Sequence, residues 1–290
     1  MPSRIPRVTR TEAIVLRHRR LGEADRIVSL LTPLQGKVDA VAKGALRPRS
    51  KLAGHLEPLT RVDVLLAHGR TLDVVTQAQM LDGFPALHSD LDRLSTAMYL
   101  LELTDRLTEE HAGDDGRNQQ PLYDLLHASL VRVARGDGLQ LAARSFELAL
   151  LEVSGFRPEW RVCVSCGVDV SADRANWSAL AGGVVCPSCQ RLHPEAVAIE
   201  PNVLKVLRAI QDGPYEEAAR IRLSPELAGA LERVMHTLMR AMTERALGSA
   251  EFVADARRAS VGVGAAAVAA PAPAVDAPHG EREQGPPPAL

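Results

Sequence analysis

Aromatic residues are scarce in this chain and absent from its first part. Phe, Trp and Tyr make up 3% of the 290 residues, and the first of them is Phe84. Proteins that hold single-stranded nucleic acids by stacking place the bases on aromatic rings. The first 83 residues therefore cannot form a stacking platform, and any nucleic-acid binding there must depend on contacts with the phosphate backbone.

Common catalytic motifs are also missing. The sequence has no Gly-rich phosphate loop of the Walker type, no Gly-x-Ser-x-Gly elbow and no His-Glu-x-x-His. These motifs would have indicated phosphoryl transfer, acyl transfer or metal-assisted hydrolysis. We therefore expect a protein that is not an enzyme.

Long apolar runs are missing as well. No run approaches the ~20 residues that a membrane-spanning helix needs, and residues 1–4 do not begin a secretory segment. One long uncharged run, residues 261–275, consists mostly of Ala, Gly and Pro. We expect a cytoplasmic protein that has no membrane partner.

The four cysteines are few but close together. They form two pairs, Cys163-x-x-Cys166 and Cys186-x-x-Cys189, separated by residues 167–185. This spacing is typical of a zinc knuckle, in which four thiolates fill a tetrahedron and leave no open position for a substrate. Disulfides, a redox Cys-x-x-Cys and a site in which His193 replaces one thiolate are the alternatives. The spacing predicts one structural Zn²⁺ ion.

Charge is distributed unevenly along the chain. The net charge is -2, yet up to residue 80 there are 14 Lys and Arg against 7 Asp and Glu. The remaining residues carry 20 Lys and Arg against 29 Asp and Glu. A basic first part followed by an acidic remainder indicates a polyanionic partner for the first part.

Short segments rich in Val, Ile, Leu and Thr, separated by turn residues, predict five strands in the first 82 residues. The expected strands are residues 11–17, 26–32, 36–42, 60–68 and 71–81. Five short strands in about eighty residues fit a small antiparallel barrel of the oligonucleotide-binding type. We predict such a barrel over residues 1–82.

Basic residues cluster in two places within this predicted barrel. One group is expected in a loop and the other around a second loop, where long cationic side chains can reach successive phosphates. A solvated basic face with no partner is the alternative. The candidate nucleic-acid-binding residues are Lys43, Arg47, Arg49 and Lys51 in the first group, Arg17, Arg19, Arg20 and Arg26 in the second, and Lys37.

Beyond residue 82 an apolar residue recurs every three or four residues along the chain, which is typical of helices. We predict helices over residues 91–107, 121–135, 140–154, 201–213 and about 225–248. Ser89 is the predicted N-cap of the first helix, and Ser224 is that of the last. The first of these helices should bury Leu91, Leu94, Met98 and Leu101. The predicted fold is therefore an α+β multi-domain chain, with a helical domain over 83–258, a zinc-binding insertion at about 156–200 and a disordered tail over 259–290.

Two further features suggest chemistry but are better explained without it. Carboxylates in the acidic segment 109–115 lie in a Gly-containing loop and should simply be solvated. The methionines Met235, Met239 and Met242 follow a helical stripe, which favours a packed core over a binding groove.

Several motifs together resemble the RecO family of bacterial recombinational repair proteins. They are Gly22-Glu23-Ala24-Asp25-Arg26-Ile27-Val28, Leu31-Thr32, Gly36, the run from Lys43 to Ser50 and Leu56-Glu57-Pro58. The resemblance covers about residues 10–255. It implies binding of single- and double-stranded DNA, annealing of complementary strands, and loading of RecA with RecR onto DNA covered by single-stranded DNA-binding protein. It also implies a nucleoid-associated location. The missing barrel aromatics depart from the family pattern, so electrostatics must do more of the binding.

Two other functions remain open from the residues alone. The acidic, Leu-rich helices would permit a non-catalytic adaptor whose helical domain holds a partner peptide. A zinc nuclease or hydrolase would need an open metal position, which four cysteines do not leave.

Overall fold

The computed structural model describes residues 8–108, 118–136 and 138–244. All of them belong to one compact unit, Met1–Leu247. The predicted acidic segment at 109–115 and the predicted tail at 259–290 lie outside the described residues. None of the helices in the described part is long and apolar enough to cross a membrane.

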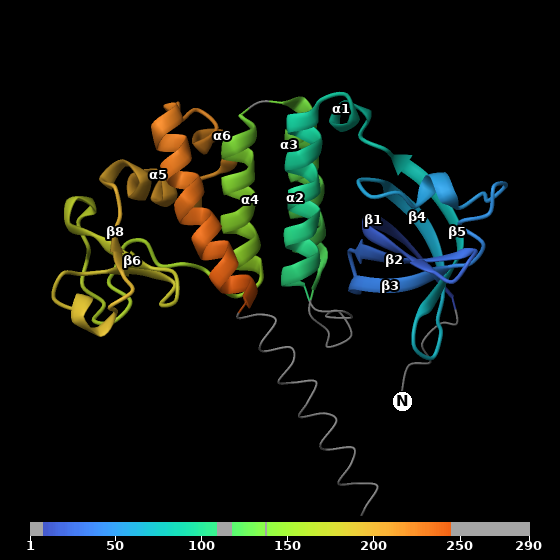
Figure 1. The fold of residues 1–290 in the computed structure, drawn as a ribbon, viewed down its shortest axis with the longest axis horizontal. Helices are drawn as coiled ribbons and strands as arrows, with labels where there is room; N and C mark the ends of the chain where they lie inside the picture. The colour runs from blue at the N-terminus through green and yellow to red at the C-terminus, as the bar shows by residue number, and fades with distance from the viewer. Residues whose placement is uncertain (1–7, 109–117, 137, 245–290) are drawn as a thin grey trace, which may run out of the picture. The chain divides into compact units, whose positions relative to one another are not determined.

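The predicted five strands are confirmed, and they form a closed barrel (Figure 1). The strand order around the barrel is β1-β2-β3-β5-β4, with β3 and β5 parallel and the other neighbours antiparallel. The strands are β1 (Val8–Leu21), β2 (Asp25–Thr32), β3 (Gly36–Ala42), β4 (Arg61–Ala67) and β5 (Asp73–Asp82).

Strand β1 is twice as long as the predicted strand 11–17 because it pairs with two neighbours along its length. Its first half pairs with β4, from Val8 opposite Ala67, and its second half pairs with β2, ending with Leu21 opposite Asp25. The register shifts between Val15 and Arg17, where the two halves meet. A strand shared in this way closes the sheet and removes its exposed edges.

The barrel interior is filled by aliphatic side chains. The buried cluster includes Val15, Val28, Leu30, Val38 and Val64, all at most 1% exposed. Burying a side chain of this kind contributes about 1.5–3 kcal/mol. The alternation of buried and half-buried residues along β4 is the period of two expected for one face turned to the core.

The helical region begins directly after the barrel and confirms the predicted helices. Helices α2, α3 and α4 lie side by side (Figure 1). The helices are α1 (Pro85–His88), α2 (Leu91–Leu107), α3 (Gln120–Arg135), α4 (Leu139–Val153), α5 (Pro201–Asp212) and α6 (Tyr215–Ala218). A final helix, here called the last helix, is described over residues 225–244.

The predicted bounds of α2 are confirmed, but its predicted N-cap was wrong by one residue. Asp90 is the N-cap, and its side chain accepts a 2.9 Å hydrogen bond from the Arg93 N–H. Ser89 instead ends the short helix α1, which the sequence pattern did not reveal. The predicted apolar stripe was also partly wrong, because Leu91 is 78% exposed and Met98 42% exposed.

The cysteine segment, residues 156–200, is called the knuckle below. It contains a three-stranded sheet in the order β7-β6-β8, formed by β6 (Asn176–Ser178), β7 (Gly183–Val185) and β8 (Val197–Ala198). Trp160 and Trp177 are buried in it with ring centroids 6.2 Å apart. On the last helix, Met235, Met239 and Met242 are buried, which confirms the predicted core.

Candidate nucleic-acid surface and metal centre

The strongest concentration of unpaired positive charge lies on residues 43–51, here called the basic loop. It connects β3 to a short 3₁₀ helix, Ala53–His55. Its cations are all exposed, and no ion pair involving them is found among the described residues. They are Lys43, Arg47, Arg49 and Lys51.

Backbone contacts fix the basic loop against the turn between β1 and β2. The Leu46 N–H donates to the Ala24 carbonyl at 2.8 Å, and the Gly44 N–H donates to an Asp25 carboxylate oxygen at 2.7 Å. Ala45 is 1% exposed and packs into the barrel core. Gly44 has a φ of 68°, a left-handed conformation that glycine adopts without strain. The cations therefore project from a supported loop.

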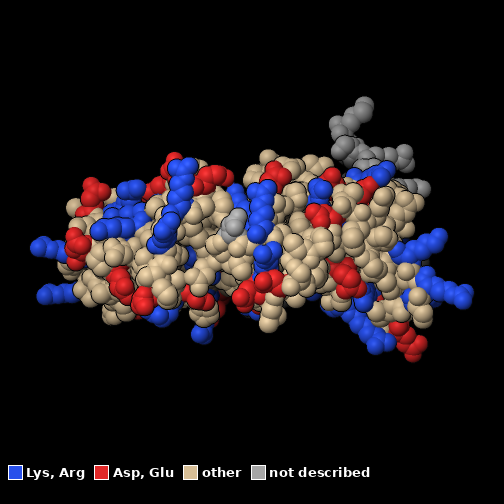
Figure 2. All heavy atoms as spheres, turned by 90° about the horizontal axis from the view of Figure 1, so that it is seen from above, with Lys and Arg blue, Asp and Glu red and all other residues tan. Residues whose placement is uncertain are grey.

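The same contacts bring a second pair of cations beside the loop. Arg19 and Arg20 are exposed near the end of β1, just before the turn that contacts the basic loop. Arg20 donates through Nε to the Gly22 carbonyl at 3.0 Å, and the Arg19 guanidinium lies 3.9 Å from an Asp39 carboxylate oxygen. In Figure 2, Lys and Arg side chains project from the right-hand end of the view, where the barrel lies.

Three other candidates are engaged by carboxylates. Arg17 Nε lies 2.6 Å from Asp105 Oδ2, and Lys37 Nζ lies 3.4 Å from Asp105 Oδ1. Arg26 lies 2.7 Å from Glu57 Oε1, and His18 lies 3.0 Å from the other oxygen of Glu57.

Burial alone would raise the pKa of Glu57, but the hydrogen bonds from Arg26 and His18 outweigh it and lower that pKa. The hydrogen bonds from Arg26 and His18 therefore favour the ionised form of Glu57.

The sequence had placed the second basic group around a loop, and its members lie on the two strands that flank the turn between β1 and β2 rather than in the turn itself. Arg17, Arg19 and Arg20 lie on β1, and Arg26 lies on β2. The reason is the length of β1, which extends beyond the apolar residues that defined the predicted strand. The partners Asp105 and Glu57 were missed. Asp105 is 68 residues from Lys37 along the chain, so no local pattern could have joined them.

The four cysteines converge on one point in the knuckle. Cys163, Cys166, Cys186 and Cys189 bring their sulfur atoms within 4.8 Å of one another, and all four are free thiols. The Sγ atoms of Cys166 and Cys186 are 3.8 Å apart. A tetrahedron with metal–sulfur bonds of ~2.3 Å would separate its sulfur atoms by roughly 3.8 Å, so the four side chains can hold a metal ion.

Backbone donors favour the thiolate form of one buried ligand. Burial raises the pKa of Cys163, but N–H groups of Cys186, Ser165 and Cys166 outweigh it and lower the pKa to about 6. The Cys186 N–H lies 3.4 Å from the Cys163 sulfur. A deprotonated sulfur is the form that binds metal ions.

His193 does not belong to the cysteine cluster. Its Nε2 lies 2.6 Å from Ser165 Oγ, and its Nδ1 lies 3.7 Å from a carboxylate oxygen of Glu195. The geometry therefore favours four sulfur ligands over a site in which His193 replaces one.

Comparison with known proteins gives a consistent result over both parts of the chain. Residues 7–84 match the family described as "Recombination protein O N terminal", and residues 88–251 match "Recombination protein O C terminal". The first match covers the barrel, and the second covers the helices and the knuckle.

Curated relatives span most of the chain. A DNA repair protein RecO of Roseiflexus sp. (strain RS-1) is 37% identical over 252 residues, which is 87% of each chain. One of Heliobacterium modesticaldum is 38% identical over 244 residues, 82% of this chain and 86% of its own. One of Symbiobacterium thermophilum is 36% identical over 251 residues, 86% of this chain and 97% of its own. The chain therefore belongs to the recombination protein O family.

Proposed function

We propose that this protein is a DNA repair and recombination mediator that binds single- and double-stranded DNA through the basic loop and the adjacent Arg19 and Arg20. The observation that carries the proposal is the set of four exposed cations on an anchored loop, with no carboxylate paired to them among the described residues. Cations free of acidic partners can contact phosphates without first breaking an ion pair.

Arg17, Arg26 and Lys37 are assigned a different role. Their carboxylate partners hold them within the fold, and the Lys37 side chain is only 10% exposed. A phosphate would have to replace a partner that is already in place. We therefore leave them out of the proposed DNA-contacting surface.

Strand annealing would follow from the same charges. Cations that neutralise phosphates release bound counterions and reduce the repulsion between two complementary strands. No bond is made or broken in this process, so the proposed function is not catalytic. The family also suggests that the protein helps to load RecA and acts with RecR and with single-stranded DNA-binding protein. It further suggests a cytoplasmic, nucleoid-associated location.

For the metal centre we propose one Zn²⁺ ion held by Cys163, Cys166, Cys186 and Cys189. Thiolates are ligands that Zn²⁺ prefers, and four of them complete its tetrahedron. The role of the ion would then be to stabilise the knuckle. In this proposal residues 1–82 form a DNA-binding domain, and residues 83–258 form a helical domain with a metal-bound insertion.

The test is DNA binding across a salt series. If about four to six phosphates are engaged on single-stranded DNA, log affinity should fall with log salt concentration at a slope of roughly -3 to -4. The variant Arg47→Glu/Arg49→Glu/Lys51→Glu should bind more weakly, with a slope smaller by about 2, and should anneal complementary strands more slowly.

A matched control is Arg220→Glu/Arg222→Glu/Arg240→Glu, which changes the net charge equally at exposed positions of the helical region. It should leave the slope close to that of the wild type. Equal losses in the two variants would show that only net charge matters, and unchanged binding in the loop variant would refute the proposed surface.

A further inference from the structure

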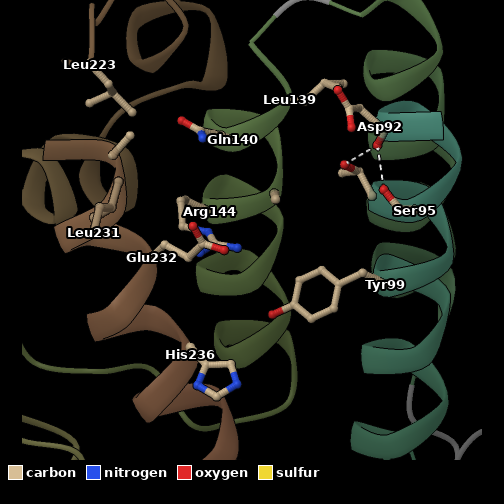
Figure 3. Close-up of a pocket in the computed structure, with 13 residues that line it drawn as sticks. Asp92, Ser95, Tyr99, Leu139, Gln140, Arg144, Leu223, Leu231, Glu232 and His236 are labelled. Carbon is tan, nitrogen blue, oxygen red and sulfur yellow. Dashed lines mark hydrogen bonds between the residues drawn. The ribbon is translucent and has the colours of Figure 1, made fainter. Parts of the chain in front are cut away.

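A pocket of about 470 Å³ lies in the helical region, between α2, α4 and the last helix. Figure 3 shows Tyr99 from α2, Arg144 from α4 and Glu232 from the last helix directed toward one another across it. The proposed DNA surface uses none of these residues. The apolar lining of the pocket is formed by Leu139, Ala143, Leu223, Ala228 and Leu231.

Positive charge in the pocket is already balanced. Arg144 has a side chain that is only 11% exposed, and its Nη2 lies 2.7 Å from Oε1 of the fully buried Glu147. The same carboxylate oxygen accepts a 2.5 Å hydrogen bond from the Tyr99 hydroxyl. At pH 8, above the pKa of about 7 that burial gives Glu147, Arg144 and Glu147 therefore form a neutral pair behind the pocket wall.

The Arg144 side chain also has unused hydrogen-bonding capacity. Its Nε–H is buried without a partner among the described residues, and so is Oε2 of Glu147. A buried donor without an acceptor is costly, and Arg144 is one of the residues that line the pocket. A main-chain carbonyl entering the pocket would give Arg144 an acceptor without introducing a charge.

Negative charge at the rim of the pocket is not balanced. Asp92 on α2 and Glu232 on the last helix are exposed, and neither forms an ion pair within the part of the chain that the structure describes. Since the pair of Arg144 and Glu147 is neutral at pH 8, these two carboxylates give the opening a negative charge at that pH. DNA phosphates are repelled by such a rim, while Lys and Arg are attracted to it.

We propose that this pocket is a docking site for a partner protein, which inserts a large apolar side chain that is flanked by Lys or Arg residues. The apolar lining receives the inserted side chain, Arg144 donates to a carbonyl of the partner's main chain, and Asp92 and Glu232 pair with the flanking cations. The site is distinct from the basic loop in both position and sign of charge, so the protein can hold DNA and this partner through separate surfaces.

Binding of short synthetic peptides to the full chain tests the proposal. The probe is fluorescein-labelled Lys-Arg-Leu-Phe-Lys-Arg-amide, measured by fluorescence polarisation. Two control probes are Glu-Asp-Leu-Phe-Asp-Glu-amide, which has the opposite charge, and Lys-Arg-Gly-Ser-Lys-Arg-amide, which lacks the apolar pair. The first probe should bind, and each control should bind at least about tenfold more weakly, because each lacks one of the two features that the pocket recognises.

The matching variants locate the site. Asp92→Lys/Glu232→Lys should weaken binding of the first probe by about tenfold, whereas Asp173→Lys/Glu216→Lys, at exposed positions outside the pocket, should not. The proposal would be overturned if the first probe did not bind, if the Gly-Ser probe bound equally well, or if the acidic probe bound more strongly. Equal losses of binding in the two variants would also overturn it.

Discussion

The ammonium nitrogen of Lys37 on β3 lies 3.4 Å from a carboxylate oxygen of Asp105 on α2, and it donates a 2.6 Å hydrogen bond to the Asp105 carbonyl. Arg17 on β1 reaches the other oxygen of the same carboxylate at 2.6 Å. Two barrel cations thus converge on one residue of the helical region. Since the side chains of Lys37 and Asp105 are only 10% and 20% exposed, this contact helps to attach the barrel to α2.

Replacing Lys37 with Met should therefore reduce stability and leave DNA binding unchanged. The variant loses two charge-assisted contacts, which contribute about 2 kcal/mol, while Arg17 still neutralises Asp105. A decrease in Tm of about 4–8 °C is expected. The salt slope of DNA binding should match the wild type. A slope smaller by about 0.7 at an unchanged Tm would instead place Lys37 on a phosphate.

The absence of aromatic rings from the barrel predicts weak base preference. Stacking on a ring contributes about 1–3 kcal/mol per base, and its strength differs among bases. With phosphate contacts alone, oligonucleotides of dT and dC of equal length should bind with affinities within about threefold of each other. Competition between the two in one binding assay checks this, and a tenfold preference would mean that bases are contacted directly.

Features that depend on neighbours along the chain could be predicted from the sequence. The five strands follow from short apolar segments with turns between them, the helices follow from apolar residues at threes and fours, and the cysteine spacing predicted the cluster that the structure shows. Each of these signals lies within about thirty residues.

Features that depend on distant partners could not be predicted in this way. Lys37 was counted among free cations because its partner is 68 residues away. The N-cap of α2 was misassigned because Asp90 and Ser89 are both good capping residues, and only the short helix α1 decides between them. The pocket on α2 combines residues from three separate helices, whose arrangement no single periodicity encodes.

Removal of the proposed Zn²⁺ ion should be visible in the fluorescence of the two tryptophans. Trp160 and Trp177 are the only tryptophans of the chain, and both lie in the knuckle, where they are at most 5% exposed. The variant Cys186→Ser, or a strong chelator, should release one equivalent of zinc and shift the emission to longer wavelength as the rings meet water. DNA binding by the basic loop should be retained, and its loss in parallel with the emission shift would contradict separate roles for the barrel and the knuckle.

The buried carboxyl of Glu147 should make stability depend on pH. Burial raises its pKa to about 7, although Arg144 and Tyr99 oppose the shift. The unfolded chain loses this proton near pH 4.5, so the folded state holds an extra proton between these values. Stability should therefore fall by up to about 3 kcal/mol as pH rises from 4.5 to 7, and level off above pH 7.

The control for this pH dependence is Glu147→Gln, which cannot titrate. The variant should be less stable at pH 8, because Arg144 loses its counterion, but its Tm should change less between pH 5 and 8 than that of the wild type. Parallel Tm curves for the two proteins would show that another group causes the pH dependence.

Two glycines of the knuckle should respond differently to substitution by Ala. At Gly183, on β7, an added Cβ would lie 2.3 Å from the Glu159 carbonyl oxygen and 2.9 Å from a Val164 methyl carbon. The Val164 N–H bonds to the Val184 carbonyl, and Glu159 pairs with Gly183, so these strands must separate to accept the methyl group. At Gly167 an added Cβ meets nothing within 4 Å, and the only cost is its φ of 72°, about 1 kcal/mol.

Gly183→Ala should therefore release zinc to a competing chelator much faster than the wild type, while Gly167→Ala should release it at a rate within a few-fold of the wild type. Equal rates for the two variants would mean that packing of β7 against residues 159–164 does not hold the metal site together.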